Sequence, residues 1–159
     1  MKRKRLNQAQ VFIVVMCLVL SVSLLGCPKV QLIAPYDQKI DQGVTDLQKQ
    51  TAEFLIGIES QGGSKPSEFE KHQKEFYDPA KVALSGLIVR SQARPLNTET
   101  TKQLKLLNKA FKNLGQADKK HGISARAAAL YETQFNQSFG YILHLEMKKQ
   151  HPEAGGAGK

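Results

Sequence analysis

The chain has 159 residues and a formal net charge of +9, and the basic segment 2–5 supplies four of those charges, which leaves about +5 on the rest. Without its first 26 residues the chain is long enough for one domain of ordinary size but not comfortably for two. Both cysteines, Cys17 and Cys27, lie within the first 27 residues. The remainder therefore forms no internal disulfide, and zinc-finger, iron–sulfur and disulfide-scaffold classes are excluded.

The N-terminal segment has the layout of a secretory signal peptide. A basic start (MKRKR) precedes the apolar stretch Val11–Leu25, which only Ser21 and Ser23 interrupt. About 15 residues of helix extend roughly 22 Å, which is short of the roughly 20 residues that a membrane span needs. A charged start, a short apolar core and a small residue before the cleavage site predict a signal peptide over residues 1–26.

The end of this segment, Leu24-Leu25-Gly26-Cys27, resembles the lipobox of bacterial lipoproteins. The resemblance implies cleavage between Gly26 and Cys27, with diacylglycerol and an N-acyl chain attached to Cys27 and no other cofactor. Two or three acyl chains hold a protein on a membrane, since each buried methylene contributes about 0.8 kcal/mol. We therefore expect a bacterial envelope protein, anchored on the extracytoplasmic side of the inner or outer membrane. An ordinary signal peptide or an uncleaved anchor, with a chance cysteine, is the alternative.

A short linker, residues 27–35, leads to the first predicted helix. Apolar residues recur there at gaps of three or four over about residues 36–60, and a glycine-rich turn follows. Ser67, with Glu70 three residues later, predicts a capping box at the start of a second helix.

Prolines shape the second helix. Pro79 predicts a kink or a restart, with Asp78 available as a second cap. Pro95 predicts that the helix ends near Arg94.

The remaining helices carry recognisable start and stop residues. Asn97 and Thr98 predict the start of the third helix, and Gly122 predicts its end. Ser124 predicts the cap of the fourth, and Pro152 lies beyond its end.

Four helices of about 22–27 residues with short connections predict an all-α, up-down four-helix bundle over residues 36–150, following a cleaved lipoprotein signal peptide. Residues 151–159 are rich in glycine and alanine and are expected to be a disordered tail. Within the second helix, the stretch Phe76–Arg90 is similar to uncharacterised bacterial proteins, and that similarity implies no function.

The chain carries no motif for catalysis, haem attachment or phosphate binding. Di-metal bundles use Glu-x-x-His pairs, and none occurs. His72 and Glu75 form the reversed pair, which is either half of a metal site or, as we favour, a solvent-facing pair. We expect no catalytic residue, no metal site and no enzymatic activity.

Each predicted helix also contains glycine, which costs about 1 kcal/mol relative to alanine in a helix interior. These glycines indicate either close contact between helices or space for an apolar guest. They are Gly43, Gly57, Gly86, Gly115 and Gly140.

The third predicted helix has a basic stripe opposite its apolar face. The stripe comprises Lys102, Lys105, Lys109, Lys112 and Lys119. It is either an ordinary solvated face or a docking strip for an acidic partner, such as an anionic lipid or an acidic protein. Nucleic acid is not expected as a partner, because secretion places the domain outside the cytoplasm.

The up-down order also gathers basic residues at the end of the bundle nearest the membrane anchor. Arg90, Arg94, Lys148 and Lys149 belong to this group and are candidate partner-binding residues. The ends of the second and fourth helices are apolar on all sides, and either pack on each other or leave a surface free to touch a membrane or a neighbour.

These patterns favour a non-enzymatic binding or adaptor module that presents a basic, partly apolar helical surface to an envelope protein or an anionic membrane component. A bundle that binds a lipid or small apolar ligand in its core is the alternative, and a metal-dependent enzyme is a third interpretation. The sequence does not predict an oligomeric state.

The lipidation site has a direct test. We expect Cys27→Ala to abolish incorporation of radiolabelled palmitate in cells and to leave the uncleaved precursor, because the acceptor thiol is lost. Labelling that continues in Cys27→Ala would contradict the assignment.

Overall fold

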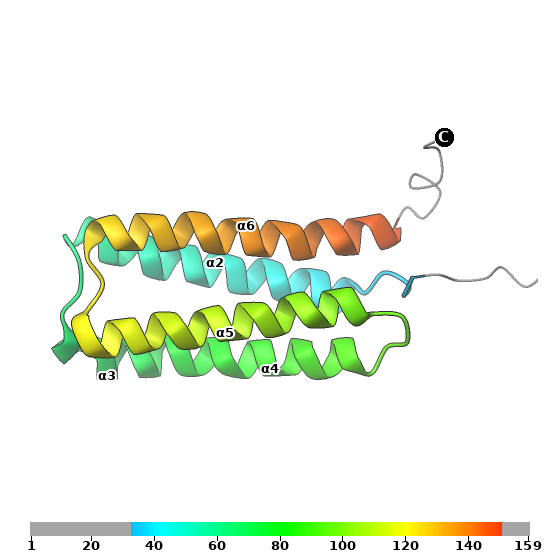
Figure 1. The fold of residues 1–159 in the computed structure, drawn as a ribbon, viewed down its shortest axis with the longest axis horizontal. Coiled ribbons are helices and arrows are strands. Elements are labelled where there is room, and N and C mark those ends of the chain that lie inside the picture. Colours follow the sequence, from blue (N-terminus) through cyan, green and yellow to red (C-terminus); the bar gives the residue numbers. More distant parts are fainter. Residues whose placement is uncertain (1–32, 151–159) are drawn as a thin grey trace, which may run out of the picture. The chain divides into compact units, whose positions relative to one another are not determined.

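The computed structural model describes residues 33–150, whose helices form an up-down bundle (Figure 1). The long helices are α2 (Gln38–Ser60), α4 (Asp78–Gln92), α5 (Thr98–His121) and α6 (Ala125–Gln150). The predicted all-α four-helix bundle is confirmed. The predicted signal peptide, the cleavage site at Gly26 and Cys27, and the tail after residue 150 lie outside the described residues.

Each long helix has two neighbours. Helix α2 packs against α4 and α6, and α5 packs against the same two helices, so that α4 and α6 lie on a diagonal. At one end of the bundle Figure 1 shows the start of α2, the α4–α5 loop and the end of α6. We call this the Asp37 end and the opposite one the Asp118 end. Because α4 and α6 lie on a diagonal, their apolar ends do not pack on each other, and Val89 and Met147 are exposed.

The core is formed by one apolar stripe from each helix. Aliphatic residues such as Ile40, Leu84 and Leu104 are fully buried. Aromatic rings join them on the side of the Asp118 end, where the Phe111 and Phe135 ring centroids are 4.7 Å apart. Within residues 33–150, no helix is long and apolar enough to cross a membrane.

The second helical segment begins differently from the prediction. A short 3-10 turn, η1 (Pro66–Glu68), comes first, and the Glu68 carboxylate accepts a hydrogen bond of 2.7 Å from the Lys65 N–H. The predicted capping box of Ser67 and Glu70 is therefore wrong. Proline favours the first position of a helix because it has no N–H to satisfy there, so the cap is Lys65, two residues before the predicted Ser67.

Pro79 is accommodated without a break in the chain. A short α-helical turn, α3 (Phe69–His72), is followed by the π-helical turn η2 (Gln73–Tyr77) and then by α4. The wider π turn ends two residues before Pro79, which has no N–H to donate. The change of helix type lets the chain stay helical through the proline. Asp78 has α-helical backbone angles and lies inside this continuous run, so its predicted role as a cap is wrong.

The other boundaries follow the prediction more closely. Gly122 ends α5 with φ of 71°, a conformation that glycine adopts without steric cost. The Ser124 hydroxyl accepts a hydrogen bond of 3.3 Å from the Ala127 N–H at the start of α6. Asn97 precedes α5 as predicted, but its side chain donates to Ser91 instead of capping the helix.

Among the glycines within helices α2 to α6, close packing requires only Gly43. A Cβ atom on Gly43 would lie 2.7 Å from Cδ2 of Leu87, so glycine lets α2 and α4 approach each other. Added Cβ atoms on Gly57, Gly86 and Gly140 would meet nothing within 4 Å. The close-contact interpretation therefore holds for Gly43.

This contrast predicts different outcomes for two equivalent substitutions in α2. Gly43→Val should destabilise the fold by about 1–3 kcal/mol, because its methyl groups overlap Leu87. Gly57→Val should be neutral or slightly stabilising, since valine has the better helix propensity and there is space for it. Urea unfolding followed by circular dichroism measures both, and equal effects would contradict the close contact.

Candidate functional site

Asp37 joins α2 to α4 at the Asp37 end. Its Oδ1 atom accepts hydrogen bonds from the backbone N–H groups of Lys39 at 3.0 Å and Ile40 at 3.4 Å, which caps α2. Its Oδ2 atom accepts from Arg90 Nε at 2.8 Å and from a guanidinium N–H of Arg94. One buried carboxylate therefore serves both as a helix cap and as the acceptor for two arginines.

The environment of Asp37 favours the ionised carboxylate. Burial by itself raises the pKa of Asp37, but the hydrogen bonds from Arg90, from the Lys39 N–H and from Arg94 together outweigh it, so the pKa lies below its ordinary value. Arg90 and Arg94 are thus directed to an internal partner, although 40% and 28% of their side chains remain exposed. The sequence did not indicate this pairing.

Lys149 is not on the surface, and its predicted place among the exposed basic residues is wrong. Its side chain is only 8% exposed and donates to Glu146, Thr100 and Asn97. Glu146 follows Ile142 by one helical turn on the buried face of α6, so its carboxylate needs a cation nearby. Lys149 supplies that cation and links α6 to the start of α5. The second carboxylate oxygen of Glu146 is buried without a hydrogen-bond partner.

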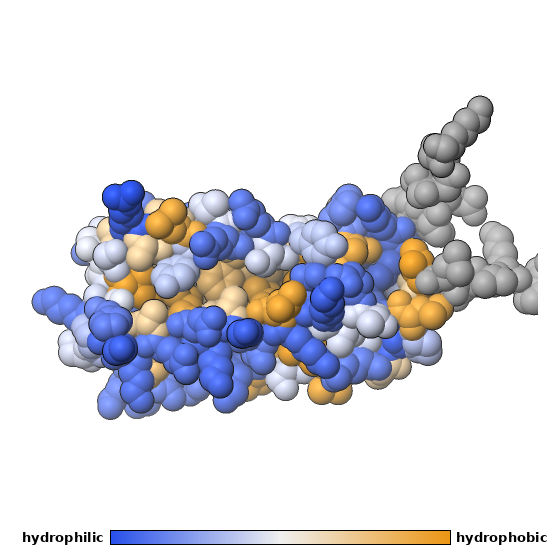
Figure 2. Space-filling model, in the orientation of Figure 1, coloured by the Kyte–Doolittle hydropathy of each residue, from blue (hydrophilic) through white to orange (hydrophobic). Residues whose placement is uncertain are grey.

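The predicted basic stripe of α5 does lie on the outside of the bundle. Lys105, Lys109 and Lys112 are exposed, and within residues 33–150 no acidic side chain forms an ion pair with them. Lys102 makes one exposed pair with Glu99, at 3.8 Å. Hydrophilic residues gather over α5 in Figure 2, with more hydrophobic surface between α5 and α6. Lys119 and Lys148 are exposed as well.

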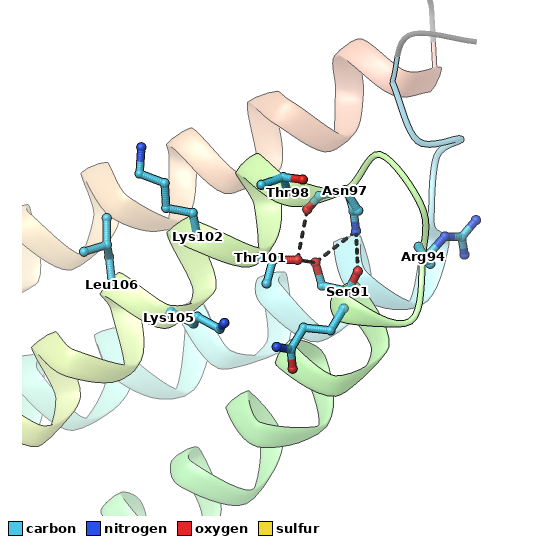
Figure 3. Close-up of a pocket in the computed structure, with 9 residues that line it drawn as sticks. Ser91, Arg94, Asn97, Thr98, Thr101, Lys102, Lys105 and Leu106 are labelled. Atoms are coloured by element: carbon cyan, nitrogen blue, oxygen red, sulfur yellow. Dashed lines mark hydrogen bonds between the residues drawn. The ribbon is translucent and has the colours of Figure 1, made fainter.

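The stripe begins beside a shallow hollow between the end of α4 and the start of α5 (Figure 3). The hollow has a volume of about 650 Å³, and Lys102 and Lys105 extend beside it from α5. Its polar floor is internally hydrogen-bonded: the hydroxyls of Ser91 and Thr101 are 2.7 Å apart, and the Asn97 amide donates to Ser91 at 2.9 Å. Lys105, which forms no ion pair within residues 33–150, therefore adds a free ammonium group to this hollow, beside the donors of Gln92, Arg94 and Thr98.

Asp118 organises the other end of the bundle. It is fully buried and accepts hydrogen bonds from the Ser64 hydroxyl at 2.9 Å and the Tyr77 hydroxyl at 3.2 Å, while His72 Nδ1 lies 2.8 Å away. Burial, and then the charge and hydrogen bond of Asp118, raise the pKa of Tyr77. The predicted solvent-facing pair is wrong for His72, whose ring is 14% exposed, whereas Glu75 is exposed.

Serine, aspartate and histidine lie together here, but their hydrogen bonds differ from those of a hydrolase catalytic triad. In a catalytic triad the serine hydroxyl gives its proton to the histidine, and the aspartate orients that histidine. Here Ser64 and His72 both bond to Asp118, and Ser64 also accepts the Ile123 N–H at 2.9 Å. The cluster ties the α2–α3 connection to the end of α5. Residues 33–150 hold no group of three or more side chains arranged to bind a metal ion.

A second hollow, of about 510 Å³, lies beside this cluster, between η2 and α5. Phe69, Tyr77 and Phe111 supply aromatic surface to it, and Lys112 and Lys119 are among its lining residues. The Lys119 ammonium lies 5.7 Å from the centre of the Phe69 ring, within cation–π range. The stripe therefore ends beside a partly aromatic pocket.

The sequence analysis missed the buried carboxylates, although a signal for them exists. Asp118 follows Leu114 by four residues, and Glu146 follows Ile142 by four, so both occupy positions of an apolar stripe. A carboxylate at such a position must be paired with a cation or hydrogen-bonded. Lys149 follows Glu146 by three residues on the same helix, a spacing that allows an ion pair. The partners of Asp118, which are Ser64, His72 and Tyr77, come from other segments and were not predictable from spacing.

No family model, curated protein or solved structure matches the chain. The candidate functional surface is accordingly defined by its own residues: the exposed lysines of α5 and the hollow beside Lys102 and Lys105.

The Asp37 junction generates a prediction about pH. Because the folded-state pKa of Asp37 is lowered, its contribution is present above the unfolded-state pKa of about 4 and is lost as the pH falls through the folded value. Asp37→Asn retains the helix cap but weakens the arginine bonds, and should cost about 1–3 kcal/mol at pH 7.

The difference between wild type and Asp37→Asn should shrink at pH 3, which lies below the unfolded-state pKa, because protonation of the carboxylate there favours the unfolded chain. Urea unfolding at the two pH values measures it. Asp46→Asn, at an exposed position of the same helix, is the matched control. A cost for Asp37→Asn that does not change with pH would contradict the charged junction.

Proposed function

We propose that this protein is a lipid-anchored, non-enzymatic binding or adaptor module of the bacterial cell envelope, attached to the membrane through Cys27. Its mechanism is tethering: the anchor fixes the location, and α5 presents a row of cations to an acidic partner. The observation that supports this most directly is the exposure of Lys102, Lys105, Lys109 and Lys112 along one side of α5.

The contrast among the cations strengthens the proposal. Arg90, Arg94 and Lys149 are engaged with internal carboxylates, which stabilise the bundle. The lysines of α5 have no such internal partner within residues 33–150 apart from the exposed Glu99 contact. A surface rich in unneutralised cations attracts an acidic surface and speeds its association.

The helix that carries the stripe is packed into the core. Leu104, Leu107 and Leu114 on the opposite side of α5 are buried in the core. At 1.5 Å per residue, the distance from Lys102 to Lys119 along the helix is about 26 Å. That length suits an extended acidic surface better than a single small anion. Anchoring raises the effective concentration of this face near other envelope components.

A second candidate function is the binding of a lipid or small apolar ligand, at the surface instead of in the core. It is favoured by the aromatic pocket beside Tyr77 and Phe111, with lysines among its lining residues. Anionic amphiphiles match that combination of surfaces. The core itself contains tightly packed side chains such as Phe139 and Leu114.

Photocrosslinking in cells tests the proposal. A photoreactive amino acid at Lys105 or Lys112 should yield a discrete protein adduct, whereas the same probe at Gln50, exposed on α2, should not. Replacing Lys102 and Lys109 with glutamate in the same chain should reduce the adduct severalfold, since it reverses the charge without touching the core.

Two outcomes would contradict the adaptor function. Adducts to lipid alone would favour the second candidate. Equal adducts at Lys105 and Gln50, insensitive to charge reversal, would show that the stripe is an ordinary solvated face.

A further inference from the structure

Leu96, in the loop between α4 and α5, has an unusual backbone conformation. Its φ is +62°, and among residues 33–150 every other positive φ belongs to a glycine. A left-handed conformation costs an L-residue with a Cβ atom roughly 1–2 kcal/mol, so glycine or asparagine is normally found there. The leucine is therefore unfavourable for the backbone and calls for a compensating contact.

The residues around Leu96 impose this conformation. Asn97 is fixed from two sides, by its donation to Ser91 and by the ammonium group of Lys149. The Leu96 carbonyl accepts a hydrogen bond of 3.3 Å from the Ala34 N–H. These bonds involve the Leu96 main chain and the side chain of its neighbour Asn97, and none involves the Leu96 side chain.

The Leu96 side chain gains limited burial from the bundle. It is 55% exposed, and Ile33, next to the Ala34 that bonds Leu96, is 43% exposed. Pro95 is exposed as well. The Asp37 end therefore carries a small group of aliphatic residues that face solvent, and Figure 2 shows hydrophobic surface at this end.

The membrane is the apolar surface within reach of this group. This inference rests on the proposed lipidation of Cys27. Ile33 is then only six residues from the anchor, which is at most about 20 Å of extended chain. Exposed Lys148 and partly exposed Arg94 belong to the same end and suit anionic headgroups. We propose that Leu96 and Ile33 form a membrane-inserting tip that docks the Asp37 end on an anionic phospholipid bilayer.

The tip would give the anchored bundle a fixed orientation. With the Asp37 end on the bilayer, α5 points away from it, and Lys112 and Lys119 lie beyond the screening length of about 8 Å from the surface. These lysines would then be available to a protein partner instead of the headgroups. A lipid anchor alone does not impose this arrangement.

The polarity around residue 96 can be measured by fluorescence in the full lipidated protein. Acylation leaves the mature chain without a free thiol, so Leu96→Cys carries a single environment-sensitive fluorophore. In vesicles of phosphatidylethanolamine and phosphatidylglycerol, we expect blue-shifted emission and at least threefold protection from iodide quenching relative to Leu130→Cys. Leu130 is 57% exposed on α6, about 30 Å from the Asp37 end.

The two proposals fail in different ways. A mass spectrum without acyl chains on the wild-type chain would contradict the anchor and the function built on it. Acyl chains on Cys27, together with equal quenching at residues 96 and 130, would overturn the tip alone.

A second variant separates membrane contact from packing within the bundle. Leu96→Gly relieves the left-handed strain and should raise the folding equilibrium constant about fivefold. In the same chain, a fluorophore attached at Ile33→Cys should become more exposed to water on vesicles, because Leu96 no longer inserts beside it. A lower folding constant, or an unchanged Ile33 signal, would show that Leu96 serves the fold and would overturn the proposal.

Discussion

The double use of Asp37 is the constraint on which the Asp37 end of the bundle depends. A single carboxylate caps α2 and accepts hydrogen bonds from Arg90 of α4 and from Arg94, two residues beyond its end, so the first turn of α2 is held to the end of α4. Arg94 belongs to the α4–α5 loop, and Asn97 with Lys149 holds the other end of that loop. The conformation of Leu96 is a consequence of these contacts rather than of its own preference.

Buried carboxylates act in the same way elsewhere in the bundle. Glu146 draws Lys149 inward and links α6 to α5, and Asp118 gathers Ser64, His72 and Tyr77 at the opposite end. Burying a charge is costly unless it is paired or hydrogen-bonded, so each site specifies one arrangement of the helix ends. The middle of the bundle has no comparable requirement and is held by aliphatic and aromatic packing.

This division also separates two kinds of cation. Those near buried carboxylates, such as Arg90 and Lys149, hold the helix ends together, whereas Lys105, Lys109 and Lys112 face solvent on α5. A basic face on the side of the bundle and an apolar tip at its end suit different partners. Together they are the basis of the proposal that the bundle docks its end on a membrane and presents its side to an acidic protein.

Spacing and local hydrogen bonding made several features predictable from the sequence. These are the four helices, the cap at Ser124, the end of α5 at Gly122 and the outward lysines of α5. The start of the second helical segment was not predictable in this way, because Pro66 and Glu68 compete with Ser67 to define it. Tertiary structure alone decided that Lys149 is buried while Lys148 is exposed, and that Arg90 and Arg94 share Asp37. Apart from the Glu146–Lys149 pair within α6, those outcomes depend on contacts between residues 49 or more positions apart, whose proximity follows from helix packing and not from any local pattern.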